Sequence, residues 1–236
     1  MSLRRAWRDE SANWIRFAQT PEHDRYYTLL NLPSFLELLP SPGQLTVDVG
    51  CGEGRLGREL SARGHRVLGF DYSEPAVRAL NEARKSDLGV VADAGDLPLP
   101  DDSVDLVIAF MSLQDMDDPP ATIEEVGRVL IPGGRFCFAI LHPFISAGDF
   151  VEAKRAFRIE RPYWEQRRHE YHSNRDGIEL TFWQMHRPMD VYMSALERSG
   201  LQVEAMREPR PAASFELELD SARLMPVFLH VRATKP

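Results

Sequence analysis

Residues 47–57 read Val-Asp-Val-Gly-Cys-Gly-Glu-Gly-Arg-Leu-Gly, and the fold can be worked out from this segment. A short β-branched strand, 45–49, runs into a loop with glycines at every second position, and a helix is expected at 55–63. Glycines between a strand and a helix let a ligand approach the backbone closely. When such a loop follows the first strand of a doubly wound sheet, it marks a ligand site.

The chain after this loop alternates between strands and helices. Further strands are expected at 66–71, 90–92, 104–110, 135–141, 201–206 and 227–233. Further helices are expected at 74–85, 118–130 and 188–199. Such alternation is typical of a parallel sheet with helices on both faces. The sequence therefore predicts an α/β fold with a doubly wound, mainly parallel seven-stranded sheet.

The remaining segments are predicted to form a lid and a cap. Residues 1–40 show short helical patterns that begin near Thr20-Pro21, and we expect them to form an N-terminal helical lid. The main domain is expected at 41–236, with 143–186 inserted after the fifth strand as a small antiparallel cap. Dividing 236 residues by about 150 per domain gives about 1.6, which suits one domain with such additions.

Charge and composition limit the class of partner. The net charge is −8, from 28 basic and 36 acidic residues, whereas a general nucleic-acid binder carries a basic excess. The longest apolar runs, 106–111 and 136–141, are far shorter than the roughly 20 residues that cross a bilayer. Two cysteines fit a reducing compartment. We therefore expect a cytoplasmic protein without a nucleic-acid or membrane partner.

Acidic residues follow the next two strands. Asp71 ends the second strand, where a carboxylate can accept from ribose hydroxyls, and Asp93 follows the third, where it can accept from an adenine amino group. Residues 52–57 match G-x-G-x-x-G, so an NAD(P)-binding oxidoreductase is one alternative and a non-catalytic nucleotide-binding module is another. The short-chain dehydrogenases require Tyr four residues before Lys, and none of the three lysines has it.

Residues 48–54 resemble the motif D-x-G-C-G-x-G of class I S-adenosylmethionine-dependent methyltransferases. The resemblance continues through Asp71-Tyr72-Ser73, Asp93 with 97–101, and 130–136, in the order found in the methyltransferase type 11 group. It covers roughly 45–141. It implies that 41–236 is a methyltransferase domain, that the cofactor is S-adenosyl-L-methionine and that the product is S-adenosyl-L-homocysteine.

The resemblance also implies which residues contact the cofactor. The glycine loop would hold the methionine end, Asp71 the ribose, Asp93 with Ala94 the adenine, and Tyr72 would stack near the adenine. Asp48 is also expected to order the loop, and Cys51 to be a small buried side chain. The complete predicted set is Asp48, Gly50, Cys51, Gly52, Gly54, Asp71, Tyr72, Asp93, Ala94, Phe110 and Met111.

The methyl acceptor is expected to be a small molecule, with O and N acceptors both open. Methyl transfer is an in-line displacement that requires an aligned acceptor. His142, directly after the fifth strand, is the candidate catalytic base, and the alternative is a histidine bonded to the loop backbone. His169 and His172 have the spacing of a helical metal pair but no third ligand, so no metal is predicted. The oligomeric state stays open.

Overall fold

A seven-stranded sheet forms the centre of the computed structural model, which describes residues 2–83, 88–151, 156–213 and 220–236. The strand order is β10-β11-β5-β4-β1-β2-β3. Strands β1 to β5 are parallel, and β11 is antiparallel to both β5 and β10. The strands are β1 Thr46–Val49, β2 Val67–Asp71, β3 Leu88–Val91, β4 Val104–Phe110, β5 Leu130–Leu141, β10 Gln202–Arg207 and β11 Phe228–Thr234. The predicted doubly wound, mainly parallel seven-stranded fold is confirmed.

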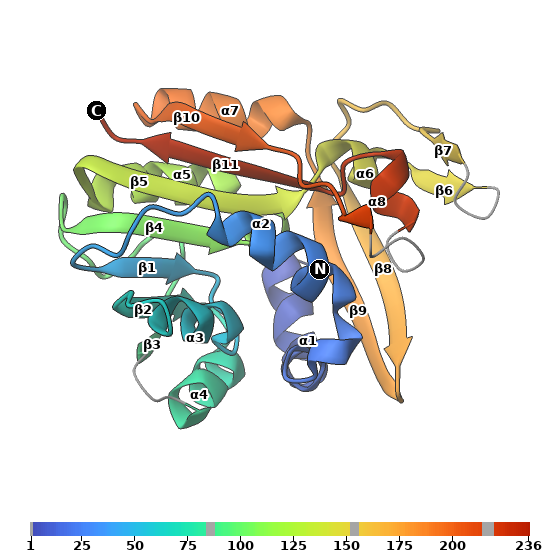
Figure 1. Cartoon of the computed structure of the whole chain (residues 1–236), viewed down its shortest axis with the longest axis horizontal. Coiled ribbons are helices and arrows are strands. Elements are labelled where there is room, and N and C mark those ends of the chain that lie inside the picture. Colours follow the sequence, from blue (N-terminus) through green and yellow to red (C-terminus); the bar gives the residue numbers. More distant parts are fainter. Residues whose placement is uncertain (1, 84–87, 152–155, 214–219) are drawn as a thin grey trace.

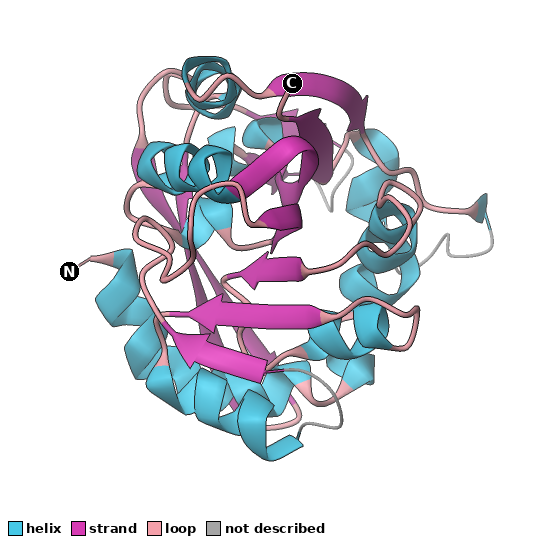
Figure 2. Cartoon of the chain, turned by 90° about the vertical axis from the view of Figure 1, so that its left-hand side faces the viewer, coloured by secondary structure: helices cyan, strands magenta, loops and turns pink. Residues whose placement is uncertain are grey.

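Helices cover both faces of this sheet (Figures 1 and 2). Successive side chains of a strand point to opposite faces. In β4, Leu106, Ile108 and Phe110 pack with α2 and α3, whereas Val107 and Ala109 pack with α5 and α7. The helices are α2 Leu32–Leu36, α3 Arg55–Ser61, α4 Glu74–Ala83, α5 Pro119–Val129 and α7 Met189–Arg198. The central strands are therefore buried on both sides, and ligands reach the sheet at its ends. The predicted end of the α4 helix, at Lys85, lies outside the described residues.

The first helix was not predicted from the sequence. Helix α1 spans Leu3–Ala18, ahead of the predicted start near Thr20. Ser2 caps it by accepting a hydrogen bond from the backbone N–H of Arg5. Trp7 Nε1 donates to the carbonyl of Trp183 at 2.7 Å, which joins α1 to the inserted hairpin. After α1 come η1 Pro21–His23, a 3-10 turn, and η2 Tyr27–Asn31, a π-helical turn.

The insertion after β5, for which the sequence suggested a small antiparallel cap, contains two antiparallel strand pairs. Helix α6 Pro143–Ala147 leads into β6 Asp149–Val151, which pairs with β7 Ala156–Arg158. The longer strands β8 Arg167–Arg175 and β9 Ile178–His186 pair along their whole length. Asp176 and Gly177 connect them with φ angles of +49° and +78°, which suit a two-residue hairpin turn. A last short helix, α8, spans Asp220–Leu224.

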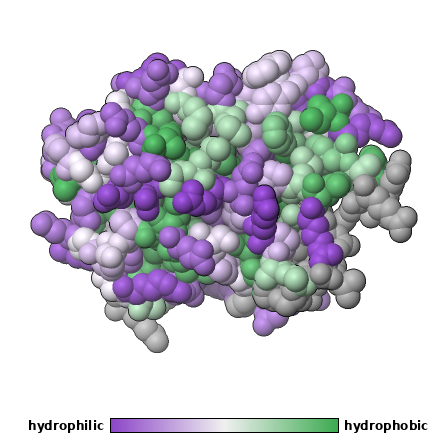
Figure 3. All heavy atoms as spheres, turned by 45° about the horizontal axis from the view of Figure 1, so that its top comes forward, coloured by the Kyte–Doolittle hydropathy of each residue, from purple (hydrophilic) through white to green (hydrophobic). Residues whose placement is uncertain are grey.

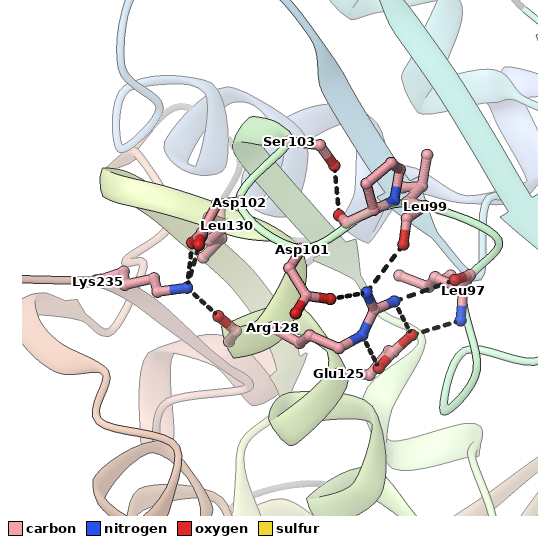
Figure 4. Close-up of polar contacts among 11 residues, drawn as sticks. Leu97, Leu99, Asp101, Asp102, Ser103, Glu125, Arg128, Leu130 and Lys235 are labelled. Atoms are coloured by element: carbon pink, nitrogen blue, oxygen red, sulfur yellow. Dashed lines mark hydrogen bonds and ion pairs between the residues drawn. The ribbon is translucent and has the colours of Figure 1, made fainter.

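A polar network ties the loop before β4 to α5 (Figure 4). Arg128 donates to the carbonyls of Leu97 and Leu99 and to the carboxylates of Asp101 and Glu125. The hydrogen bonds to Glu125 lower the pKa of its carboxyl, although burial opposes them. This network lies away from the sheet's ligand-binding edge and orders the backbone that leads into β4.

The face that carries β10 and α7 is turned toward the viewer in Figure 3, where apolar and polar residues are interspersed. Strand β10 forms one edge of the sheet, and its exposed large apolar side chains are Val203 and Met206. Isolated apolar side chains of this kind are ordinary for a protein surface. The concave part of the molecule lies elsewhere, at the carboxyl ends of the parallel strands.

Candidate functional site

The fold creates a cavity of about 1460 Å³ at the carboxyl ends of the parallel strands. Its walls are the loop after β1, the ends of β2 and β4, α1 with the segment that follows it, and the β8–β9 hairpin. Figure 1 shows α1 and β9 facing the ends of β1 and β4. Cavities for one small ligand typically hold about 300–1,000 Å³. This one has room for two small molecules side by side.

The loop after β1 presents backbone rather than side chains to this cavity. Gly50, Gly52 and Gly54 have φ angles of +75°, +56° and +85°, in the left-handed region that favours glycine. A Cβ atom on Gly50 would lie 2.4 Å from the Cβ of Ser112, so no side chain fits there. The N–H groups of Gly50 and Cys51 both donate to the carbonyl of Phe70 in β2, at 2.7 and 3.1 Å. The loop is thus held tightly against the sheet.

Asp71, at the end of β2, supports this loop directly. Its two carboxylate oxygens accept from the backbone N–H groups of Gly52 and Ser73, each at 2.8 Å. Burial raises the pKa of the Asp71 carboxyl above its usual value, and the two hydrogen bonds oppose the rise. Asp71 lines the cavity, and each carboxylate oxygen keeps acceptor capacity for a ligand.

Tyr72 and Asp93 lie on the next part of the wall, against the first turns of α1. Arg4 donates a hydrogen bond to Asp93, and Arg8 donates one to the Tyr72 hydroxyl. Both guanidinium groups also stack on the Tyr72 ring, at 4.2 and 4.9 Å from its centroid. Burial opposes ionisation of Asp93, but hydrogen bonds from Gly95 N–H and Arg4 lower its pKa overall. Ala94 lines the cavity beside Asp93.

Asp48 and Cys51 are two buried side chains of the site. Asp48 is 2% exposed and lines the cavity beneath the loop. Cys51 is also buried, and burial raises the pKa of its thiol well above the usual value. Burial raises the pKa of the second cysteine, Cys137, to about 12. Both thiols are therefore protonated at neutral pH and act as small apolar side chains.

Phe110 and Met111 bring the end of β4 to the same cavity. The Phe110 ring packs edge-on against Tyr27, with centroids 5.8 Å apart. Met111 has a φ of +56°, which is uncommon for a residue with a side chain. Its N–H donates to Ala139 at 2.8 Å, and its carbonyl accepts from Gln114 Nε2 at 2.7 Å. Strained backbone of this kind is found where a site fixes an atom in place.

The structure does not support the predicted catalytic role of His142. Its side chain is fully buried, and it does not belong to the cavity wall. Nδ1 accepts from the N–H of Phe144 at 3.2 Å and so caps α6, while Nε2 lies 3.2 Å from Oε1 of Glu208. Burial lowers the pKa of His142, although Glu208 opposes this. The backbone-bonded alternative is the one observed, because the chain turns into α6 directly after β5.

His169 and His172 also differ from the helical arrangement that their spacing suggested. Both lie on strand β8, where residues three apart point to opposite faces. His169 lines the cavity, whereas His172 hydrogen-bonds Thr181 through Nδ1 at 3.1 Å. Within the described ranges, no three His, Cys, Asp or Glu side chains are grouped as a metal site.

The N-terminal segment was expected to form a helical lid, but the helix α1 itself was not predicted. Leu3, Ala6, Trp14 and Phe17 recur at helical spacing behind a capping serine, and this signal could have identified the helix. What the sequence could not show is that α1 lies across the cavity. Arg55, the first residue of α3, was also overlooked. It forms an ion pair with Asp24 at 2.9 Å and stacks on the rings of Tyr27 and Trp14.

Comparison with known proteins identifies the central part of the chain. Residues 47–138 match the model of a methyltransferase domain. The chain is 38% identical over 152 residues to 27-O-demethylrifamycin SV methyltransferase of Amycolatopsis mediterranei, covering 61% of this chain and 49% of the relative. It is 30% identical over 133 residues to malonyl-[acyl-carrier protein] O-methyltransferase of Serratia marcescens, covering 56% and 48%. The chain thus spans about half the length of these curated relatives.

Solved structures resemble the chain over most of its length. An S-adenosylmethionine-dependent methyltransferase from Mesorhizobium loti superposes with a TM-score of 0.71 at 29% identity, covering 86% of this chain and 96% of the other. A protein from Listeria monocytogenes, described as a possible methyltransferase of the same kind, also gives a TM-score of 0.71. It is 23% identical, and the match covers 87% of this chain and 96% of the other. Among the described residues, no helix is both long and apolar enough to cross a membrane.

Proposed function

We propose that the chain, whose residues 47–138 match a methyltransferase domain and which resembles an S-adenosylmethionine-dependent methyltransferase, methylates a small molecule. The observation that carries the proposal is the loop of three left-handed glycines beside the Asp71 carboxylate, within a cavity large enough for two small molecules. The names of the relatives 27-O-demethylrifamycin SV methyltransferase and nocamycin O-methyltransferase support a small acceptor.

The residues present fit S-adenosylmethionine. At Gly52 an added Cβ would lie 3.2 Å from Trp14 Nε1, closer than an ordinary van der Waals contact, so only glycine leaves the loop backbone bare for a ligand there. We assign the methionine end to this loop with Asp48 and Cys51, the ribose to Asp71, and the adenine to Tyr72, Asp93 and Ala94. Phe110 and Met111 line the cavity, and we assign them to the part near the transferred methyl group.

When bound, S-adenosylmethionine supplies both the methyl group and the sulfur leaving group. The residues that line the cavity would have to hold the acceptor atom in line with the carbon–sulfur bond. The protein's task is to align the acceptor about 3 Å from the methyl carbon and to exclude water. We assign water exclusion to residues 1–40 as a helical lid and to 143–186 as a cap on the domain 41–236.

Calorimetric titration with S-adenosylhomocysteine and, separately, with NAD tests the cofactor. We expect binding of S-adenosylhomocysteine, and binding of NAD alone would refute the proposal. Asp71→Asn and Asp93→Asn should each weaken binding about tenfold or more, because each removes a charged hydrogen-bond acceptor. Asp9→Asn, on the exposed side of α1, is the matched control and should bind like the unmodified protein. A screen of small-molecule acceptors with labelled methyl donor then identifies the substrate.

A further inference from the structure

Four side chains in the cavity wall each contain a buried polar atom with no hydrogen-bond partner among the described residues. They are His23 Nδ1, Tyr27 Oη, Gln114 Oε1 and Asp115 Oδ1. Buried polar atoms without partners are rare in folded proteins, and leaving one unpaired costs about 1–3 kcal/mol. Because all four residues line the same cavity, we infer that a ligand completes their hydrogen bonds.

Only one of these four groups is suited to take up a proton. The Gln114 amide is not basic. Burial raises the pKa of Tyr27 to about 12, so its hydroxyl keeps its proton and can donate a hydrogen bond to a ligand. Burial raises the pKa of Asp115 well above its usual range, although Arg187 opposes this, which favours the protonated acid. The imidazole of His23 remains as the group with a free basic nitrogen.

A carboxylate from the hairpin orients this imidazole. Nε2 of His23 lies 3.0 Å from Oδ2 of Asp176, in the turn between β8 and β9. Because a carboxylate accepts, it holds the imidazole proton on Nε2 and leaves the lone pair on Nδ1. A base held in one tautomer by a third group is the arrangement that activates hydroxyl groups in many enzymes.

The segment that carries His23 is fixed to the cofactor-binding part of the site. Asp24, the next residue, accepts from Arg55 at 2.9 Å and from the N–H of Tyr27 at 3.1 Å. Arg55 begins α3, directly after the last glycine of the loop. His23 is therefore tied to the glycine loop on one side and to the hairpin turn on the other.

His23 adjoins an aromatic cluster through Phe17. The ring of Phe17 lies 5.8 Å from the imidazole, and it stacks on Trp14 at 5.9 Å and packs edge-on against Phe182 at 5.5 Å. Tyr171 lies 6.0 Å from Phe182 across the hairpin. All four aromatic residues line the cavity. Such a wall favours a flat apolar ring over a flexible or charged ligand.

We propose that His23 is the catalytic base for a hydroxyl acceptor on a flat aromatic ring, and that Asp176 is its positioning residue. This deepens the proposed function and rests on it. The oxygen–hydrogen bond of the acceptor breaks and its proton goes to Nδ1 of His23. The same oxygen bonds to the methyl carbon, while the carbon–sulfur bond breaks with its electron pair going to sulfur. Nδ1 is buried in this structure, so the step requires the acceptor to displace the side chains that cover it.

Nitrogen NMR on the full chain labelled in its histidines tests the tautomer without any methyl transfer. We expect His23 to carry its proton on Nε2 and a free lone pair on Nδ1, with its signal assigned by its loss in His23→Gln. Asp176→Asn should populate the other tautomer, because an amide can donate to Nε2. His172→Gln, on the same hairpin but outside the cavity wall, should leave the His23 signal unchanged. A proton on Nδ1 in the unmodified protein would overturn the proposal.

Methyl transfer to 2-naphthol, with aniline as the amine probe, tests the base. His23→Gln should lower kcat for 2-naphthol about 10²- to 10⁴-fold, with KM and S-adenosylhomocysteine binding changed less than about twofold. Asp176→Asn should lower kcat for 2-naphthol less than His23→Gln does, and His172→Gln should keep full activity. Aniline, which attacks as a neutral amine, should depend little on His23.

The outcomes separate this inference from the function on which it rests. Failure of the unmodified protein to bind S-adenosylhomocysteine would refute the proposed function itself. Methylation of aniline but not 2-naphthol would leave that function standing and overturn the hydroxyl acceptor. Equal loss of 2-naphthol turnover in His23→Gln and His172→Gln would overturn the role of His23.

Discussion

The guanidinium of Arg4 donates a hydrogen bond to the carboxylate of Asp93, so the first turn of α1 engages the acid that we assign to the adenine. Arg4 and Arg8 also stack on the Tyr72 ring that we assign to the adenine face. The N–H of Leu3 donates to Asp117 at 2.9 Å and fastens the same turn to the loop after β4. In this arrangement α1 and the adenine compete for the same groups.

Arg4→Ala should therefore increase the affinity for S-adenosylhomocysteine. Both members of the ion pair are partly exposed, at 40% and 44%, and such pairs contribute about 0.2–1 kcal/mol. Calorimetry should show a gain of up to about fivefold. Arg5→Ala, which changes the neighbouring exposed arginine, is the control and should leave the affinity unchanged. Weaker binding in Arg4→Ala would mean that Arg4 holds the cofactor instead of competing with it.

Gly50→Ala should destabilise the protein more than Gly133→Ala. Both glycines have left-handed backbone, at φ +75° and +78°, and alanine there costs about 1–2 kcal/mol. A Cβ at position 133 meets nothing within 4 Å, whereas at position 50 it meets the Ser112 side chain at 2.4 Å. Urea unfolding should show a further loss of about 1–3 kcal/mol for Gly50→Ala from overpacking. Equal losses would show that the loop relaxes freely.

Arg58→Ala should cost far more stability than Arg63→Ala, although both arginines pair with a glutamate on or beside α3. Glu53 is 1% exposed and accepts from Arg58 through both oxygens, at 2.9 and 2.7 Å. Removing Arg58 leaves a buried carboxylate unpaired, which costs about 3 kcal/mol. Glu59, the partner of Arg63, is 44% exposed, and that pair contributes at most about 0.5 kcal/mol. Thermal and urea unfolding compare the two, and similar losses would contradict the burial argument.

His230 should make the protein less stable in mild acid. It is fully buried, Nε2 lies 2.7 Å from Asn31 Oδ1, and burial lowers its pKa to about 3. The unfolded chain binds this proton below about pH 6.5 and the folded chain does not. The free energy of unfolding therefore falls as the pH drops from about 6.5 toward 3, by up to about 1.4 kcal/mol per pH unit.

His230→Gln removes this proton and keeps a side chain that can donate to Asn31. Its urea-unfolding free energy should fall less steeply than that of the unmodified protein between pH 6.5 and 4.5. The slopes are compared, because the substitution also changes the packing. His172→Gln should keep the original slope. Identical slopes in all three proteins would refute the assignment of this pH dependence to His230.

Most of the central sheet could be predicted because its signals are local. Residues 104–110 were predicted to the residue, since a central parallel strand is apolar along its whole length. The loop at 50–54 was recognised because its glycines are required by backbone geometry. In contrast, α1 was not predicted, and its burial depends on the hairpin strand β9, at least 160 residues later.

His142 shows the limit of reasoning from position. It does follow the fifth strand, but whether its side chain points to the cavity depends on the direction the chain takes into α6. The pair of His23 and Asp176 is the opposite case. These residues are 153 positions apart, and neither stands in a recognisable motif.

The glycine loop, the acids after β2 and β3 and the apolar runs were enough to predict a mainly parallel sheet and, through the family resemblance that they carry, the class of cofactor. Each of these signals depends on neighbouring residues along the chain. Which side chains close over the site, which arginine engages Asp93 and which histidine has an unpaired nitrogen were decided by tertiary structure. These depend on where the N-terminal helix and the inserted hairpin meet, and contacts between segments so distant in sequence leave no local pattern to read.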